Sequence, residues 1–298
     1  MLSFADFQTK VKNYTPTVYD AVDNPAVLPR YSHRAHTNSE LYYECYKLID
    51  ADVRAGSRIL DIGAHPGTFL RLCKDVFFPN RKPDLAGTGL ILEEDEENFK
   101  NKAKKLAGII DFVSSSLCFK DYFQSTGISF TALDLDYCFH PSLDDCPEGS
   151  YDVITCIEVI EHLHTPYKLI NTIRKCLNPG GVCVIETNNV HNINGILKLL
   201  LTQGSNLDFE LIDRYQTEGY TTKRPHLRFY SIKEISCLLQ KAGLLIEASY
   251  SFDWDIPRAM MRDKSLFAEG KYIIAGKILP ALFPRKKSHL IVKARKPL

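Results

Sequence analysis

Short apolar runs alternate with amphipathic segments between residues 58 and 187, and this alternation predicts a parallel sheet with helices on both faces. The runs that predict its strands are 58–62, 85–92, 129–135, 151–157 and 182–187. Two later apolar runs, 244–250 and 289–294, predict an antiparallel pair at the far side of the sheet. The pattern therefore indicates an α/β fold with seven strands, most of them parallel.

Signals for helix starts lie between these runs. Glu40–Val53 has apolar residues at helical spacing. Thr165 is predicted to cap a helix that has Pro166 at its first position. Ser231 and Glu234 form the pattern of a capping box, which predicts a further helix directly after them.

The rhythm of strands and helices also predicts the domain organisation. Residues 1–56 are predicted to form an N-terminal helical cap, and residues 57–298 one domain with insertions at about 188–228 and 251–287 that shape a substrate pocket. Within the second insertion, the apolar stretch 272–284 predicts a buried helix broken by a proline. The alternative is peripheral contact of this stretch with a membrane surface.

Composition narrows the class of protein. The chain has 298 residues, of which 45% are hydrophobic and 24% charged, as in ordinary folded domains. Its 37 basic and 36 acidic residues give a net charge of +1, which provides no broad field for a polyanion such as nucleic acid, although a local basic patch stays open. Nine cysteines without a Cys-x-x-Cys pair, no signal-peptide pattern and no apolar run of about 18 residues predict a cytoplasmic protein with reduced thiols and no transmembrane segment.

The most informative segment is a glycine-bearing turn after the first predicted strand. Asp61 lies near the end of that strand, and Gly63 and Gly67 follow in the turn that leads into a helix. Residues without side-chain bulk leave room for a ligand at the carboxyl end of a strand. The spacing alone leaves both a nucleotide or nucleoside site and a purely structural turn open.

Three segments in the same order carry a family resemblance: Asp61-x-Gly63-x-x-x-Gly67, residues 150–163 and Leu177-Asn-Pro-Gly-Gly181. Together they closely resemble the class I S-adenosylmethionine-dependent methyltransferases. The resemblance covers roughly residues 56–250. It implies a Rossmann-like fold, S-adenosylmethionine as cofactor, and methyl transfer as the reaction.

The same resemblance implies which residues bind the cofactor. The loop would hold the methionine part, an acidic residue after the second strand would hold the ribose, and Glu158 would lie near the transferred methyl group. His65 stands where the family has its middle glycine, and no acid falls at the usual end of the second strand, so Glu93 or Glu94 would substitute, and Glu93 is taken as the site residue. The predicted cofactor-binding residues are Asp61, Gly63, Ala64, His65, Gly67, Glu93, Asp134, Leu135 and Glu158.

A possible metal or acid-base site follows the fourth predicted strand. Glu158, Glu161 and His162 are spaced i, i+3, i+4, so a helical turn would place them on one face, where they would share a cation or protons. Oxygen-rich ligation suits Mg²⁺ or Mn²⁺. The Glu-x-x-Glu-His pattern resembles that of ubiquinone-biosynthesis O-methyltransferases and small-RNA 2′-O-methyltransferases, and the resemblance adds His226 as a fourth metal ligand. The alternative is that these residues serve packing, cofactor contact or substrate hydrogen bonds.

The predicted reaction is methylation of a hydroxyl group on a small-molecule, sugar or glycan-type acceptor. His162 and His226 are the predicted catalytic residues, because a hydroxyl must lose its proton as it attacks the methyl group. One alternative is an RNA 2′-O-methyltransferase that uses a divalent metal, with Arg224 and Arg228 as a local phosphate site. The other is a non-catalytic member of the fold, which the residue at position 65 and the missing acid would explain.

Overall fold

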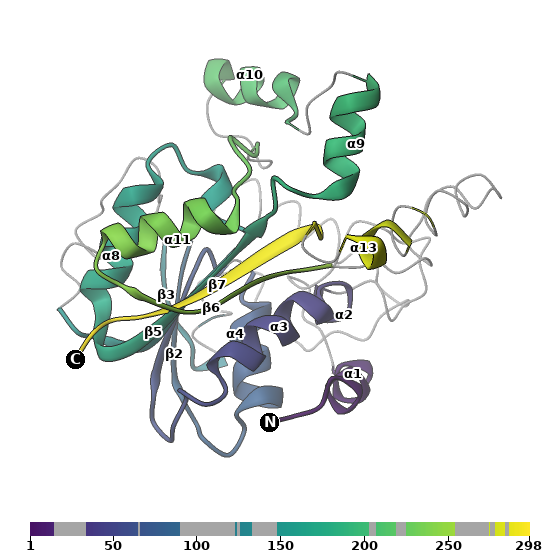
Figure 1. Ribbon diagram of the computed structural model, residues 1–298. Helices are drawn as coiled ribbons and strands as arrows, with labels where there is room; N and C mark the ends of the chain where they lie inside the picture. The colour runs from purple at the N-terminus through teal and green to yellow at the C-terminus, as the bar shows by residue number, and fades with distance from the viewer. Residues whose placement is uncertain are drawn as a thin grey trace.

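The computed structural model describes residues 1–14, 34–64, 66–89, 123, 126–132, 148–202, 207–218, 225–253, 274, 278–283 and 286–298. These residues contain one seven-stranded sheet in the order β3-β2-β1-β4-β5-β7-β6 (Figure 1). Its strands are β1 (Arg58–Ile62), β2 (Asp84–Gly89), β3 (Ser129–Ala132), β4 (Tyr151–Ile157), β5 (Leu177–Asn188), β6 (Leu245–Phe252) and β7 (His289–Arg295).

The pairing of the strands confirms a mainly parallel sheet. β1 to β5 pair in parallel, whereas β7 is antiparallel to both β5 and β6. β1 has β2 on one side and β4 on the other, so the order of strands reverses there, and open α/β sheets bind ligands at such a point. β5 begins at Leu177, five residues earlier than predicted, and its pairing with β4 is irregular over 178–181.

Helices cover both faces of the sheet (Figure 1). α8 (Pro166–Cys176) and α11 (Ile232–Lys241) pack on one face, in a core with Leu60, Ile62 and Cys156. α3 (Ser39–Ile49), α4 (Thr68–Leu72) and the π-helix η3 (Cys73–Phe77) pack on the other, with Val153 and Val184. The alternation of side chains along the central strands supplies both cores.

The predicted starts of α11 and α8 agree with the structure, whereas the predicted end of α3 does not. Ser231 Oγ accepts from the Glu234 amide at 3.2 Å, and the Glu234 carboxylate accepts from the Ser231 amide at 2.7 Å, which confirms the capping box. Thr165 is the N-cap residue of α8 and Pro166 begins the helix, as predicted, but the Thr165 side chain makes no cap hydrogen bond. α3 ends at Ile49, four residues before the predicted end.

A helix at the N-terminus, α1 (Phe4–Lys12), was not predicted. An aromatic cluster holds it, since the Phe7 ring lies 4.9 Å from that of Phe77 and 5.7 Å from that of Tyr43. The Leu2 amide also donates to the Tyr46 hydroxyl at 2.6 Å. The short α2 (Arg34–Thr37) then leads into α3.

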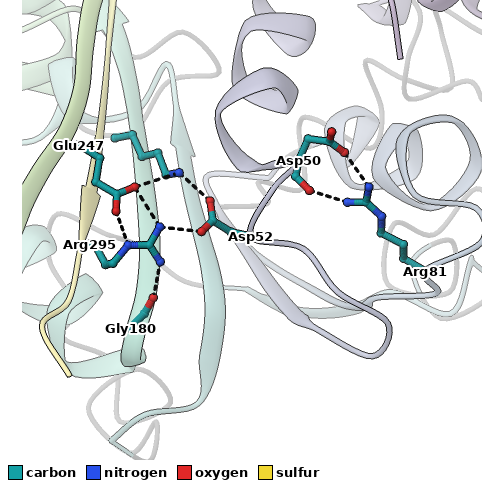
Figure 2. Close-up of polar contacts among 7 residues, drawn as sticks. Asp50, Asp52, Arg81, Gly180, Glu247 and Arg295 are labelled. Carbon is teal, nitrogen blue, oxygen red and sulfur yellow. Dashed lines mark hydrogen bonds and ion pairs between the residues drawn. The ribbon is translucent and has the colours of Figure 1, made fainter. Parts of the chain in front are cut away.

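The turn after α3 is bound to the sheet by ion pairs (Figure 2). Asp52 accepts from Lys293 Nζ at 2.6 Å and from Arg295 Nη2 at 2.7 Å, and Glu247 pairs with both of these cations. We call these four residues the Asp52 network. Nearby, Asp50 pairs with Arg81 at 3.0 Å. The turn that precedes β1 is therefore joined to β6 and β7.

The described parts of the predicted insertions form α9 (Ile193–Thr202), α10 (Phe209–Glu218) and α13 (Leu279–Leu282); in Figure 1, α9 and α10 stand apart from the sheet. Leu282 is 66% exposed and Phe283 42%, so the prediction of a buried helix in the stretch 272–284 is wrong for its described residues. Contact of this stretch with a membrane surface stays a prediction. No helix among the described residues is long and apolar enough to cross a membrane.

The cysteines agree in part with the predicted core thiols. Five of the six that the structure describes are buried, and Cys237 is exposed. None of these six forms a disulfide.

Candidate active site

The turn after β1 is fixed by the backbone of the neighbouring strand. The amides of Gly63 and Ala64 both donate to the Thr88 carbonyl at 2.8 Å. The Gly67 amide donates to the Ala64 carbonyl, which closes the turn before α4 begins. These bonds fix the described residues on either side of position 65 at the carboxyl edge of the sheet.

Both glycines of the turn are required by geometry. Gly63 has φ +80° and Gly67 φ +86°, in the left-handed region where side chains are strained. A Cβ on Gly63 would lie 2.1 Å from Val159 Cγ2, and one on Gly67 would lie 2.6 Å from Phe123 Cζ. Positions 63 and 67 therefore accept only glycine, because Val159 and Phe123 fill the space that a side chain would need.

A pocket opens beside this turn. Four of its lining residues come from α2 and α3, six from the end of β1 through α4, and two from the end of β4. They are Arg34, Asn38, Leu41, Tyr42, Asp61, Gly63, Ala64, Pro66, Thr68, Phe69, Ile157 and Glu158. The predicted cofactor residues Asp61, Gly63, Ala64 and Glu158 are therefore brought together, and Gly67 lies in the same turn.

The other four predicted cofactor residues, His65, Glu93, Asp134 and Leu135, lie outside the described residues. The contribution of α2 and α3 to the pocket was not predicted residue by residue. Among the described residues, Arg34 Nε is buried without a hydrogen-bond partner. A basic residue at the start of a helix that precedes the glycine turn is the signal that could have indicated it.

Two groups of acidic and histidine side chains lie beyond the end of β4. Glu161, His162 and His226 form the first, with one candidate ligand atom from each within 4.8 Å of the others, and we call it the His226 cluster. Glu158, Glu186 and His289 form the second under the same criterion, and we call it the His289 cluster. The four predicted metal ligands are thus divided between two groups.

The division follows from the backbone after β4. The helical turn η4 covers only Ile160–His162, and Glu158 precedes it with φ +53°. Glu158 is therefore not on one helical face with Glu161 and His162, and that part of the prediction is wrong. Its amide donates instead to the Glu186 carbonyl at 3.2 Å, so it lies beside the end of β5.

Within the His226 cluster, hydrogen bonds fix both residues of η4. His162 Nδ1 lies 2.9 Å from the Pro225 carbonyl, which can only accept, so Nδ1 carries the proton and Nε2 of the neutral ring carries the lone pair. Glu161 is fully buried, and its Oε2 accepts from the Thr187 hydroxyl at 2.7 Å. The rings of His162 and His226 lie 4.7 Å apart.

Comparison with known proteins decides the family. A family model described as a methyltransferase domain matches residues 36–249, which is most of the chain. The chain belongs to this methyltransferase-domain family. The resemblance found in the three sequence segments is confirmed at the level of the family.

Individual relatives match shorter parts of the methyltransferase domain. Ubiquinone biosynthesis O-methyltransferase of Psychrobacter cryohalolentis is 46% identical over 41 residues, 14% of this chain and 16% of that protein. tRNA U34 carboxymethyltransferase of Campylobacter curvus is 31% identical over 86 residues, 28% of this chain and 27% of that protein. The matched regions therefore span less than a third of each of these two curated relatives.

A solved S-adenosylmethionine-dependent methyltransferase from Mesorhizobium loti superposes with a TM-score of 0.50 at 17% identity. The superposition covers 87% of this chain and 100% of that one. It shows that the methyltransferase domain has the Rossmann-like fold that the sequence predicts.

The electrostatics of the methyltransferase domain differ between its buried carboxylates. Burial raises the pKa of Asp61 to about 7, although the Thr155 hydroxyl that donates to it at 2.6 Å acts in the opposite direction. Burial, and after it repulsion from Glu158, raises the pKa of Glu161 well above its usual range. Burial lowers the pKa of His226, so this ring is neutral at pH 7.

The His289 cluster has a different balance. Burial lowers the pKa of His289, but its bonds to Glu158 and Glu186 outweigh this and raise it to about 10. Burial and the charge of Glu158 raise the pKa of Glu186 to about 8. Burial raises the pKa of Glu158, yet the bond from His289 and the charge of the three imidazoles lower it overall.

Glu186 and His289 were missed by the sequence analysis because each lies in an apolar strand. An acid directly after Val182-Cys-Val-Ile185 is the signal that could have indicated Glu186, since a buried carboxylate needs partners. His289 begins β7 and had no such signal.

Proposed function

We propose that this chain is an S-adenosylmethionine-dependent methyltransferase that transfers the methyl group to a hydroxyl of a small-molecule, sugar or glycan-type acceptor. The observation that carries the proposal is the pocket that the glycine turn and Glu158 line together. It lies at the carboxyl ends of the strands, beside the point where the strand order reverses, and open α/β sheets bind nucleoside-containing ligands there. The family of the chain agrees with this chemistry.

The chain's own residues divide the work of binding. In our proposal the turn from Asp61 to Gly67 takes the methionine part of the cofactor. Arg34, whose Nε has no hydrogen-bond partner among the described residues, would pair with the methionine carboxylate. Residues 1–56 would act as the cap, because α2 and α3 supply one wall of this pocket.

The His226 cluster would receive the proton that the acceptor hydroxyl loses. Because His162 Nδ1 donates to the Pro225 carbonyl, Nε2 is the atom that takes up a proton. His226 is also neutral at pH 7 and is the second candidate base. Positioning of the hydroxyl against the methyl group would supply a large part of the rate.

Alternatively, the same cluster holds a divalent cation, and His162 Nε2 is then a ligand rather than the base. Glu161 Oε1 is buried and has no hydrogen-bond partner among the described residues, and such an oxygen is costly unless a ligand meets it. One carboxylate and two imidazoles make a donor set richer in nitrogen than the predicted four ligands, so Mn²⁺ fits better than Mg²⁺, with Zn²⁺ as competitor. A cation held by Glu161, His162 and His226 would polarise a hydroxyl and ease its deprotonation.

Calorimetric titration tests both cofactor binding in the pocket and cation binding in the His226 cluster. The protein is titrated with S-adenosylmethionine and with S-adenosylhomocysteine, each with and without Mg²⁺, Mn²⁺ or Zn²⁺. We expect micromolar binding of both cofactor forms and a separate isotherm for Mn²⁺. Absence of cofactor binding under every condition would contradict the proposal and favour the non-catalytic alternative.

Variants separate the cation from the cofactor. Glu161→Gln and His162→Ala should abolish the Mn²⁺ isotherm and leave cofactor affinity within about twofold, because neither residue lines the pocket. His164→Ala is the matched control, since this exposed histidine lies two residues away and outside both clusters. Loss of Mn²⁺ binding in the control as well would show that the cation binds elsewhere.

RNA 2′-O-methylation is a second candidate, favoured by His226 and by the partial similarity to a tRNA-modifying enzyme. The net charge of +1 speaks against it. The test is methyl transfer to a short RNA. Transfer that is lost when the terminal 2′-hydroxyl is removed would favour RNA 2′-O-methylation over a small-molecule acceptor.

A further inference from the structure

We propose that Glu186 and His289 are positioning residues that hold the Glu158 carboxylate in the cofactor pocket. The inference rests on the proposed function, because it assigns the orientation of a pocket residue to two residues outside that pocket. Neither of the two lines the pocket or belongs to the His226 cluster.

Glu158 needs such support because its backbone is strained. A glutamate with φ +53° lies in the left-handed region that non-glycine residues rarely adopt. Strained residues of this kind persist when their surroundings over-determine them, and they concentrate at functional sites. The side chain of Glu158 is 27% exposed, so burial alone does not fix it.

Three contacts determine where the carboxylate lies. Asn188 Nδ2 is 3.2 Å from Oε1 and 3.3 Å from Oε2 of Glu158. His289 Nδ1 lies 3.3 Å from the same Oε1. Both partners belong to neighbouring strands, since Asn188 of β5 pairs in register with His289 of β7.

The same Nδ1 atom of His289 contacts Glu186 as well as Glu158, and its contact with Glu186 is the shorter of the two. This atom lies 2.9 Å from Oε1 of Glu186, which is fully buried on β5. Glu186 pairs in register with Ile157, the residue before Glu158. The chain of contacts from Glu186 through His289 to Glu158 therefore depends on the registers of β4, β5 and β7, which are set by the core of the sheet.

The charges agree with this arrangement. The raised pKa of His289 keeps its imidazole protonated at pH 7, where it faces the ionised carboxylate of Glu158, while Glu186, whose pKa is raised to about 8, is largely neutral. A protonated imidazole donates a charge-assisted hydrogen bond, which is stronger and more directional than a neutral one. The carboxylate of Glu158 is kept ionised and oriented, which suits a pocket for a sulfonium cation.

A double-mutant cycle tests the inference through cofactor affinity. His289→Phe keeps a ring beside Phe252, whose centroid is 5.8 Å from that of His289, and removes the donor. We expect His289→Phe and Glu158→Gln each to weaken S-adenosylmethionine binding by about tenfold, the usual scale for a hydrogen bond to a charged group. Binding of S-adenosylhomocysteine, which lacks the positive sulfonium, should weaken by less than about threefold.

The decisive readout is coupling between the two residues. If His289 acts through Glu158, His289→Phe should have no further effect in the Glu158→Gln background, within about twofold. His289→Gln, which retains an amide donor, should recover part of the affinity. Lys293→Gln is the matched control on the same strand, because it removes a buried cation of β7 far from the pocket and should leave both affinities unchanged.

Equal losses from His289→Phe in the two backgrounds would overturn the inference and leave the proposed function intact. Wild-type protein that binds neither cofactor form would overturn both. If His289→Phe does not fold, Glu186→Gln replaces it, because it keeps the shape of the side chain and should show the same coupling to Glu158.

Discussion

Charged side chains are arranged differently at the two ends of the parallel strands. We call the side of the sheet where these strands begin the amino edge and the side where they end the carboxyl edge, and antiparallel β7 runs from the carboxyl edge to the amino edge. At the amino edge, the Asp52 network contains two carboxylates and two cations, and each carboxylate pairs with both cations (Figure 2). At the carboxyl edge, the His289 cluster contains two carboxylates around one imidazole. The Glu161 carboxylate of the neighbouring His226 cluster is also buried there.

The edges also differ in how completely polar atoms are satisfied. Arg295 at the amino edge donates to Asp52, Glu247 and the Gly180 carbonyl. At the carboxyl edge, Glu161 Oε1 and Glu186 Oε2 are buried without a hydrogen-bond partner among the described residues. A network in which every carboxylate pairs with a cation holds parts of a fold together. A group with more buried carboxylates than cations, and with shifted pKa values, is typical of a site that binds a ligand.

The strongest test of the comparison uses one glycine from each edge. Gly63→Ala places a Cβ 2.1 Å from Val159 Cγ2 at φ +80°, so it should lower the free energy of unfolding by about 3 kcal/mol and abolish cofactor binding. Gly56→Ala has φ +74° with nothing within 4 Å, and should cost only about 1 kcal/mol. Chemical denaturation and calorimetry measure the two effects.

The bulkier Gly63→Arg fills the turn completely and should also abolish binding. Val159→Ala, combined with Gly63→Ala, should recover stability because it removes the clashing methyl group. Tight cofactor binding by either Gly63 variant would show that the cofactor does not use this turn.

A change at the amino edge should affect stability without affecting the pocket. Asp52→Ala removes the partner of Lys293 and Arg295, and since Asp52 and Lys293 are largely buried we expect a loss of ~2 kcal/mol in the free energy of unfolding. Cofactor affinity should stay within about twofold of wild type. A large loss of affinity would mean that the edges are coupled and that the comparison is wrong.

The smallest effect is the opposite pH dependence of the two edges. The pKa of His289 is raised from 6.5 to about 10, so its stabilisation is complete below pH 6.5 and is lost as the pH rises toward 10. The pKa of Glu186 is raised from 4.5 to about 8, so its protonated form stabilises the fold fully below pH 4.5, and this contribution is lost as the pH rises through about 8. The thermal midpoint should therefore fall by roughly 3 °C between pH 7 and pH 9.

The amino edge should respond at acid pH instead. The bond from Arg295 lowers the pKa of Glu247 below 4.5, so its stabilisation is present above pH 4.5 and is lost as the pH falls through the lowered value. Glu186→Gln should flatten the alkaline limb of the stability profile and leave the acid limb unchanged. A change in the acid limb alone would contradict the assignment of these limbs.

The strands could be predicted from the sequence because their signals are local. β1 and β4 have the predicted bounds, and the capping box at Ser231 begins α11. α1 was missed because its position depends on aromatic contacts with η3 and α3, which lie more than 30 residues away. Its apolar spacing alone did not distinguish it from a loop.

The site could be predicted only where one short segment supplies it. Asp61, Gly63 and Gly67 share one turn, so their proximity follows from the sequence. Glu186 and His289 are 103 residues apart and meet only through the register of β5 and β7. The spacing of residues within β5 or β7 does not predict how these two strands pair, so the His289 cluster could be found only from the structure.

The place of β7 between β5 and β6 also has a consequence for biosynthesis. β6 reaches the sheet only through β7, which is made after it, so a nascent chain cannot complete the sheet until residues 289–295 have left the ribosome. His289 arrives with the same strand. The orientation of Glu158 is therefore fixed only after β7 has emerged, and a chain truncated before residue 289 would have neither the sheet nor the site completed.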